Sequence, residues 1–459
     1  MITKEYINDV KTNGNGALAK AINGLKDTSS LTYFFENLGF LPKDFDGSLL
    51  LPFLNHESSN IRFWIVKNLG KLGDTKYIKP IAKIAKEDTD SMVRREAVSS
   101  LGRMRNEKNI PILFNLLSDR DPKILAQVIR GLLVFKGNET VDTQLKQLVH
   151  HPNEFIQQVI QKEYFPKKIM DSHFPHAKTY EYLNNVVVHG DVREILQSVP
   201  EDSIHLTFTS PPYYNARDYS IYPSYNAYLQ FLADVFEKVH RATKEGRYFI
   251  LNTSPIIIPR VSRQHSSKHY PIPFNIHPLL VDMGWEFIDD IVWLKPEASV
   301  KNRNAGFLQH RKPLAYKPNP VTEYLMVYRK KSDKLIDWNI REYDRKTIEE
   351  SKVLGNYETS NVWHIDPTFD KNHSAVFPVE LCNRVIIFYS FKGDVVFDPF
   401  AGSGTVGKAA IALERSFFLA EKDEKYFQLI KKNLGNKSLF SNKEAQFLTL
   451  NDFTALTKI

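Results

Sequence analysis

Cysteine is almost absent from this chain of 459 residues, whose only thiol is Cys382. A single cysteine excludes a disulfide framework and a zinc cluster held by cysteines. The chain also lacks an apolar run of the roughly 18 residues that a membrane-spanning helix needs. Its first residues show no basic stretch followed by an apolar one, so they do not resemble a secretion signal. These absences predict a protein of the reducing cytoplasm, with no metal site.

The composition indicates a globular protein of several domains. Hydrophobic residues make up 42% of the chain and charged residues 25%, which provides enough apolar mass for buried cores. At about 100 to 200 residues per domain, we expect two to four domains rather than one small binding module. The chain has 61 Lys and Arg against 53 Asp and Glu, a net charge of +8. This mild excess favours a polyanionic partner, although a basic enzyme without such a partner has the same balance.

Residues from about 56 to 165 repeat with a period of about 31 to 32 residues. Each unit has apolar residues at positions i, i+4 and i+8, which form one face of a helix, and a second helix-like stretch lies between units. The aligned residues are Ile61, Ile65 and Leu69; Val93, Ala97 and Leu101; Ile124, Val128 and Leu132; and Ile156, Ile160 and Tyr164. The pattern resembles short HEAT-type repeats, in which stacked helix pairs bury each other's apolar faces.

The repeats are followed by a region of different character. Short β-branched runs there alternate with helix-like stretches, which predicts a mostly parallel, doubly wound α/β sheet. Ligands of such a sheet bind at the carboxyl ends of its strands. The predicted divisions are an N-terminal helical segment at 1–55, the repeats at 56–165, a linker at 166–180, the α/β domain at 181–435 and a C-terminal tail at 436–459.

A loop rich in small residues follows one predicted strand, from Asp398 to Thr405 (DPFAGSGT). Its glycines let the backbone approach a ligand, and a helix is expected to begin near Thr405. Glu421 ends the next predicted strand, where its carboxylate could accept two ribose hydroxyls of a nucleoside-bearing cofactor. The loop also fits the G-x-G-x-x-G dinucleotide fingerprint from Gly402 onward. The carboxylate of Asp398 favours a cationic cofactor such as S-adenosylmethionine over a pyrophosphate.

A second motif, Thr209 to Tyr213 (TSPPY), directly follows another predicted strand. The Ser210 hydroxyl and the Pro211 carbonyl are two hydrogen-bond acceptors, and Tyr213 offers a flat face for stacking. Two acceptors and an aromatic ring suit a planar ring that bears an amino group. Accepting both amino hydrogens shifts electron density onto the nitrogen, which can then attack a methyl sulfonium without a covalent enzyme intermediate.

The two motifs, in this order, resemble those of the bacterial DNA amino-methyltransferases of restriction-modification systems, in the circularly permuted beta order. The resemblance covers about residues 181 to 435 and implies a Rossmann-like domain that uses S-adenosylmethionine. It implies that Ser210, Pro211 and Tyr213 hold a base flipped out of double-stranded DNA and that Pro212 shapes the turn.

The resemblance also implies a set of cofactor-binding residues. The methionine end of the cofactor is expected at Asp398, Pro399, Phe400, Gly402, Ser403, Gly404 and Thr405, and the ribose at Glu421. Asp191, in the sequence His-Gly-Asp, resembles the family's aspartate that bonds the cofactor adenine. Phe377 and Pro378 resemble an element that packs against the cofactor from the other side, although Ser374 stands where the family often has proline after His373.

DNA contacts are expected in two basic stretches. The segment from Lys295 to Lys331 carries nine Lys and Arg against two Glu, and the stretch from 260 to 270 adds further cations. We therefore expect DNA-contact insertions at about 255–320 and 332–372, although these loops could instead be ordered against the protein itself. The candidate DNA-binding residues are Arg260, Arg263, Lys268, Lys301, Arg303, Arg311, Lys312 and Lys317.

The target base is expected to be cytosine, methylated at N4, because serine at the first position of the SPPY motif is associated with that base in the resembling family. Adenine N6 is the alternative. Cytosine C5 methylation needs a thiolate nucleophile, and Cys382 lies in a helix-like stretch, where we expect a buried small hydrophobe.

Two other classes of function compete with DNA methylation. An RNA or protein methyltransferase is disfavoured by the order of the motifs, and an inert scaffold is disfavoured by the intact motif residues. The role of the repeats is open: they could clamp DNA, dock a cognate restriction endonuclease or mediate self-association. Their expected binding surface carries Arg62, Lys67, Lys71, Arg94, Arg95 and Arg103, which could equally be a solvated face.

Overall fold

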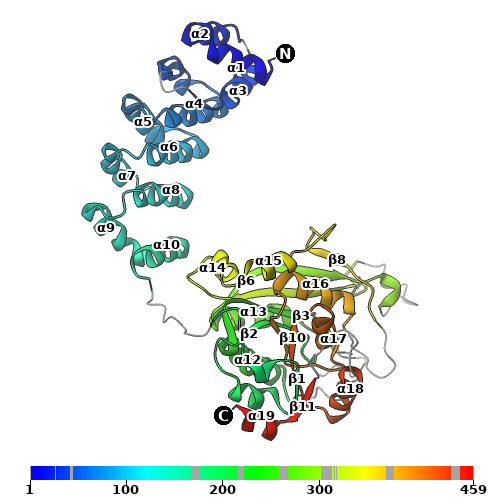
Figure 1. The fold of residues 1–459 in the computed structure, drawn as a ribbon. Helices are drawn as coiled ribbons and strands as arrows, with labels where there is room; N and C mark the ends of the chain where they lie inside the picture. The colour runs from blue at the N-terminus through cyan, green and yellow to red at the C-terminus, as the bar shows by residue number, and fades with distance from the viewer. Residues whose placement is uncertain are drawn as a thin grey trace. The chain divides into compact units, whose positions relative to one another are not determined.

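The computed structural model describes residues 2–25, 27–41, 45–166, 175–214, 222–258, 262, 264, 267–300, 313–314, 316, 318–368, 377–435 and 445–457. The chain divides into two compact units, residues 1–169 and 170–459 (Figure 1). The candidate DNA-contact residues Arg260, Arg263, Lys301, Arg303, Arg311, Lys312 and Lys317, and His373, lie outside the described residues.

The first unit is all helical. Its α-helices are α1 (Lys4–Thr12), α2 (Asn15–Asn23), α3 (Thr28–Glu36), α4 (Ser59–Leu72), α5 (Ile78–Glu87), α6 (Ser91–Arg103), α7 (Ile110–Asn115), α8 (Pro122–Leu133), α9 (Glu139–Lys146) and α10 (Glu154–Tyr164). Helices α4, α6, α8 and α10 lie in one layer, and α5, α7 and α9 in the other (Figure 1). This arrangement confirms the predicted helical repeats.

The apolar face of each repeat is buried as its spacing predicts. Ile61, Val93, Ile124 and Ile156 are at most 1% exposed, and the residues four positions after each are fully buried. Small residues allow the layer to pack closely: a Cβ added to Gly102 on α6 would lie 2.8 Å from the Cα of Gly131 on α8. Aspartates cap the helices, since the Asp90 carboxylate accepts the backbone N–H groups of Met92 and Val93.

The second unit contains a nine-stranded sheet in the order β11-β1-β10-β9-β2-β3-β7-β6-β8. Its strands are β1 (Val186–His189), β2 (Ile204–Thr209), β3 (Thr243–Thr253), β6 (Trp285–Leu294), β7 (Thr322–Lys330), β8 (Val362–His364), β9 (Val395–Asp398), β10 (Ser416–Glu421) and β11 (Gln446–Thr449). A separate antiparallel pair consists of β4 (Ile256–Ile258) and β5 (Lys268–Tyr270). Neighbouring strands of the large sheet are parallel except at β7, which is antiparallel to both β3 and β6.

Helices cover both faces of this sheet, which confirms the predicted fold class. The helices are α11 (Val192–Ile195), α12 (Tyr225–Ala242), α13 (Ile272–Asp282), α14 (Ile336–Arg341), α15 (Arg345–Glu350), α16 (Val379–Tyr389), α17 (Thr405–Ala412), α18 (Glu424–Leu434) and α19 (Leu450–Leu456). One apolar core packs α11, α12, α13 and α19 against the sheet, and another packs α16, α17 and α18. Within the described ranges, no helix combines the length and apolarity needed to cross a membrane.

The C-terminal residues belong to the sheet, which extends the unit beyond the boundary expected at 435. Strand β11 pairs in parallel with β1, from Val186 opposite Gln446 to His189 opposite Thr449. Phe453 on α19 is fully buried and stacks on Phe418 of β10 at 5.5 Å. The sequence predicts a tail at 436–459 because this strand has only four residues and adds to an edge formed far earlier in the chain.

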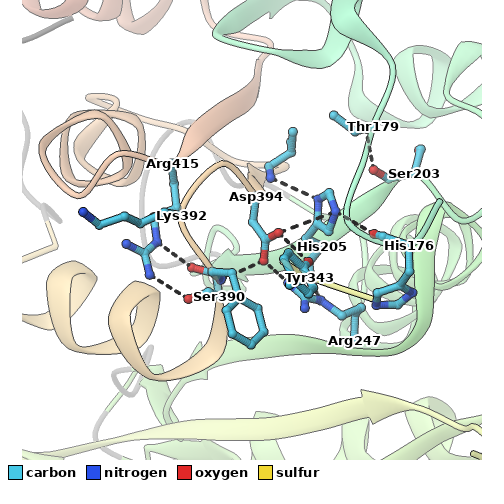
Figure 2. A network of polar contacts seen from close by, with 12 residues as sticks. His176, Thr179, Ser203, His205, Arg247, Tyr343, Ser390, Lys392, Asp394 and Arg415 are labelled. Carbon is cyan, nitrogen blue, oxygen red and sulfur yellow. Dashed lines mark hydrogen bonds and ion pairs between the residues drawn. The ribbon is translucent and has the colours of Figure 1, made fainter. Parts of the chain in front are cut away.

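A buried polar network joins the amino ends of β2, β3 and β9 (Figure 2). Asp394, fully buried before β9, forms an ion pair with Arg247 of β3 and accepts the Tyr343 hydroxyl at 2.6 Å. His205 of β2 accepts the Val395 N–H at its Nδ1, so its proton lies on Nε2, which donates to the His176 carbonyl. Burial lowers the pKa of His205 to about 3, so the ring is neutral. The segment before β1 and the region after β7 are thereby tied to the sheet.

Replacing Arg247 should strongly destabilise this unit, because Asp394 would be left as a buried charge without its countercharge. We expect Arg247→Leu to reduce the free energy of unfolding by about 3 to 5 kcal/mol. Urea unfolding followed by tryptophan fluorescence measures this, since four of the five tryptophans lie in the second unit. Lys352→Gln, which breaks the exposed pair with Glu349, is the control and should change stability by less than about 0.5 kcal/mol. Equal losses of unfolding free energy in the two variants would contradict the structural role of the buried pair.

Candidate active site

The carboxyl ends of the parallel strands meet at one edge of the sheet and bring the two motifs together. Strand β9 lies between β10 and β2, so the ends of these strands, Glu421, Asp398 and Thr209, are neighbours. The Thr209 hydroxyl donates a hydrogen bond of 2.6 Å to Asp398 Oδ1. This bond connects the strand before the TSPPY motif to the strand before the glycine-rich loop, across 189 residues of sequence.

The glycine-rich loop has the backbone that its residues predict. Gly402 and Gly404 have φ angles of +53° and +80°, in the left-handed region that favours glycine. A Cβ at Gly404 would also lie 3.1 Å from the side chain of Ile430 on α18. Helix α17 begins at Thr405, whose hydroxyl lies 3.1 Å from that of Ser403. A glycine turn that leads into a helix N-terminus is a backbone arrangement that ligands can approach closely.

Asp398 is the electrostatic centre of this loop. This residue is 2% exposed, and burial raises its pKa from an ordinary 3.8 to about 7. The Thr209 hydroxyl and the Phe400 N–H, at 3.1 Å, both donate to Oδ1 and partly oppose that rise. A carboxylate that is costly to ionise favours a ligand that brings positive charge. The site therefore fits a cationic cofactor better than a pyrophosphate.

Glu421 and Asp191 extend this edge along β10 and β1. Glu421 accepts the Gly402 N–H and the Asp423 N–H, each at 2.8 Å, and burial raises its pKa. Asp191 caps α11, and its carboxylate accepts the Arg193 guanidinium at 2.9 and 3.0 Å and Lys422 at 3.2 Å. The hydrogen bonds from Arg193 hold the pKa of Asp191 well below its usual range. Both carboxylates can accept further hydrogen bonds from a polar ligand at this edge.

The TSPPY motif forms the loop after β2. Pro211 is buried, whereas Ser210, Pro212 and Tyr213 are half-buried. Ser210 Oγ lies 3.4 Å from the Asn252 amide at the end of β3, and the Tyr213 hydroxyl donates to Glu323 of β7 at 3.1 Å. Burial raises the pKa of Tyr213, so its hydroxyl stays protonated as a donor.

Three residues that sequence reasoning did not identify hold this loop. Glu323 accepts the Asn252 amide at 2.6 Å and forms an ion pair with Lys295, just after β6. The ammonium of Lys295 also lies 4.4 Å from the centre of the Trp293 ring. The buried Asn252 Oδ1 has no hydrogen-bond partner in the described part of the chain, so it is an available acceptor beside Ser210. Each of these three residues is polar and lies near the end of a strand, and this pattern in the sequence could have identified them.

The remaining candidate residues take separate places. The Phe377 ring stacks on Phe208 of β2 at 4.8 Å, and Pro378 precedes α16. Cys382 on α16 is fully buried and burial raises its pKa, which confirms its interpretation as a small hydrophobe. Lys268, the one candidate DNA contact within the described residues, is exposed on β5, 5.0 Å from the centre of the Tyr270 ring.

Part of the basic segment from 295 to 331 is paired within the protein. Lys295 pairs with Glu323, Arg329 with Glu286, and Lys330 with Asp202 at 2.9 Å. The ammonium of Lys330 also donates to the Thr243 carbonyl at 2.7 Å. These three cations are therefore structural, and the counted excess overstates the charge that is available to an external ligand.

Asp398→Asn should stabilise the ligand-free protein in a pH-dependent way. Because the folded-state pKa of Asp398 lies above its ordinary value, ionisation progressively costs stability as pH rises from about 4 to 7. Asparagine retains an acceptor for Thr209 without the charge. We expect the melting temperature to rise by about 5 °C at pH 8 and by about 2 °C at pH 5. Scanning calorimetry measures this; the exposed Glu380→Gln is the control, and a rise independent of pH would contradict the assignment.

Comparisons with known proteins identify the family of the methylase region and of the repeats. The DNA methylase family (N6/N4) matches residues 204–432, and the HEAT-repeat family matches residues 48–99 and 78–162. The Type II methyltransferase M.ScaI of Streptomyces caespitosus is 30% identical over 243 residues, covering 50% of this chain and 75% of that protein. The Type II beta methyltransferase M.BslI of Bacillus sp. is 26% identical over 260 residues, covering 53% of this chain. That match spans only 27% of M.BslI.

A solved structure matches over a similar share of the chain. TTHA0409 from Thermus thermophilus, in complex with S-adenosyl-L-methionine, is 25% identical, with a TM-score of 0.46 over 58% of this chain and 98% of that one. The match to the methylase family and the identity to M.ScaI are the comparisons that decide the family. The chain belongs to the N6/N4 family of DNA methylases and carries HEAT repeats ahead of its methylase region.

Proposed function

We propose that this protein transfers a methyl group from S-adenosylmethionine to the exocyclic N4 of cytosine in double-stranded DNA. The observation that carries the proposal is the bond between Thr209 and Asp398, which places a loop suited to an amino-bearing ring beside a loop suited to a cationic cofactor. Adenine N6 is the alternative target, with the same machinery. The choice of cytosine rests on Ser210, because serine at this motif position is associated with cytosine in the resembling family.

The residues of the glycine-rich loop would hold the cofactor. Asp398 would face its positive charge, and Glu421 would bind the ribose, since its carboxylate has lone pairs beyond the two that accept backbone N–H groups. Asp191, just after the neighbouring strand β1, would bond the adenine. When bound, S-adenosylmethionine supplies an electrophilic methyl group on a sulfonium centre. No covalent intermediate on the protein is required.

The TSPPY loop would bind and orient the flipped base. Stacking on Tyr213 offsets part of the few kcal/mol that unstacking a base costs. Ser210 Oγ and the Pro211 carbonyl would accept hydrogen bonds from the amino group of the base. These bonds would increase the electron density on its nitrogen. Asn252 Oδ1, which has no partner among the described residues, would be a third acceptor beside Ser210. Positioning and hydrogen bonding supply the rate enhancement in this account.

We infer that the protein protects host DNA from a separate restriction endonuclease. Several relatives carry the name of Type II methyltransferases, although M.BamHII of Bacillus amyloliquefaciens is called an orphan methyltransferase. The endonuclease would act on the same DNA, and the proposal does not require the two proteins to bind each other.

The proposed reaction is tested by identifying its product. Purified protein is incubated with S-adenosylmethionine and unmethylated plasmid DNA, and the nucleosides are analysed by mass spectrometry. We expect 4-methylcytosine, and Asp398→Ala should yield none. Finding 6-methyladenine instead would replace the target base and keep the mechanism. A wild-type protein that binds S-adenosylmethionine but leaves DNA unmethylated would contradict the proposal and direct attention to RNA or protein substrates.

Glu323 should act on catalysis through the orientation of Tyr213. Glu323→Gln removes a charge-assisted acceptor worth about 1.5 to 3 kcal/mol, so we expect kcat to fall about tenfold or more. Affinity for S-adenosylmethionine, measured by calorimetry, should stay within about twofold, because Glu323 lies with the base-binding loop. Tyr213→Phe keeps the ring and loses the same bond, so the double variant should be no slower than the slower single variant. Additive losses in kcat would refute this coupling.

A further inference from the structure

One of the two layers of the repeats carries a larger net positive charge than the other. Helices α4, α6, α8 and α10 carry nine Lys and Arg against three Glu. The nine are Arg62, Lys67, Lys71, Arg94, Arg95, Arg103, Lys123, Arg130 and Lys162. In the other layer, α5, α7 and α9 carry four Lys against three acids. The first layer has 50 residues and the other 24, so Lys and Arg are about equally frequent in both, and the first layer differs in having fewer acids per residue.

Some of these cations are used within the fold. Arg62 makes a two-pronged bond to Asp88 at 2.7 and 2.8 Å, and the side chain of this arginine is 11% exposed. Arg94 donates to the Asp88 carbonyl at 3.1 Å, and Arg103 pairs with Glu96 at 3.1 Å. These arginines hold neighbouring helices together or pair within one helix. They are therefore less available to a binding partner than the sequence analysis expects.

Two further cations also have partners: Lys71 donates to the Gly39 carbonyl at 3.2 Å, and the ammonium of Lys67 lies 4.5 Å from the centre of the Trp64 ring. The remaining four form no side-chain hydrogen bond or ion pair with the residues that the structure describes: Arg95, Lys123, Arg130 and Lys162. Three of them line a groove of about 520 Å³ beside α8 and α10, and the lining contains no acidic side chain. Leu133, Phe155 and Val159 are among its apolar members. The groove therefore has an unbalanced positive potential over an apolar floor.

Cations recur at one position on three of the four helices. Lys67, Arg130 and Lys162 each lie six residues after the aligned buried isoleucine of their helix, and Arg95 lies one helical turn before the same position on α6. Helices pack about 8 to 10 Å apart, so the four helices span roughly 30 Å. That length corresponds to about nine base pairs of duplex DNA at about 3.4 Å per step. The row of cations is therefore long enough to lie along several phosphates of one DNA strand.

We propose that this layer, formed by α4, α6, α8 and α10, binds the phosphodiester backbone of double-stranded DNA in addition to the contacts made by the methylase unit. The inference rests on the proposed function for its choice of polyanion. Apolar side chains in the groove can pack against the deoxyribose faces between phosphates. A short acidic peptide could fill the groove at α8 and α10 but would not use the row across all four helices.

The test removes the three groove cations and measures duplex binding. The variant Arg95→Gln, Lys123→Gln, Arg130→Gln keeps good helix formers and deletes only charge. Binding of the full-length protein to a duplex of about 60 base pairs is followed by fluorescence anisotropy from about 0.05 to 0.3 M salt. At about 0.1 M salt we expect affinity to fall by about tenfold or more, and the slope of log K against log salt to flatten by about two to three.

A matched variant separates a specific surface from net charge. Lys79→Gln, Lys83→Gln, Lys86→Gln removes the same charge from exposed positions of α5, in the other layer. It should bind the same duplex within about twofold of wild type. Equal losses in both variants, or no loss in the groove variant, would overturn the proposal. Weaker binding of labelled poly-glutamate together with unchanged duplex binding would assign the surface to an acidic protein instead.

Methylation distinguishes this inference from the proposed function. The groove variant should methylate plasmid DNA to completion at saturating DNA, because all three substitutions lie in the first unit and none in the methylase sequence. If wild-type protein methylates no DNA, the proposed function fails, whereas the binding comparison between the two variants still decides whether the layer contacts a duplex.

Discussion

The hydrogen bond from Thr209 to Asp398 spans the boundary between two loops that have different tasks. It depends on the parallel pairing of β2 with β9, which places their carboxyl ends side by side. In the proposed function, one loop would present acceptors and a ring to a base, and the other would present a buried carboxylate to a cation. Since methyl transfer needs the donor and the amine in line, this strand pairing is the constraint on which the rest of the site depends.

The buried polar network that stabilises the sheet lies at the amino ends of its strands, and the candidate site lies at their carboxyl ends. The amino ends of β2, β3 and β9 are joined by Asp394, Arg247 and His205, in which the buried carboxylate has its countercharge and hydrogen-bond donors. At the carboxyl edge, Asp398 has hydrogen bonds but no cation among the described groups that shift its pKa. Burial therefore raises the pKa of Asp398. A site that must receive a cation holds a carboxylate that is costly when the site is empty.

Local pattern was sufficient to predict much of the fold. The period of the repeats, the alternation of strands with helices, and both motif loops depend on neighbours in sequence, and the structure contains the corresponding elements. The antiparallel strand β7 was not foreseen, because nothing local distinguishes its direction. Glu323, Asn252 and Lys295 were missed for the same reason. Glu323 meets Tyr213 across 110 residues and Asn252 across 71, and only the order of strands in the sheet makes them neighbours.

The central claim is that the TSPPY loop and the glycine-rich loop form one site for base and methyl donor. A crystal structure of the full chain with S-adenosylhomocysteine and a duplex that contains its methylated sequence tests this most directly. We expect the target base outside the stack, with its amino group bonded to Ser210 Oγ and the Pro211 carbonyl, its ring on Tyr213, and the cofactor between Asp398 and Glu421. A base that stays stacked in the duplex, or a cofactor bound away from Asp398, would contradict the account.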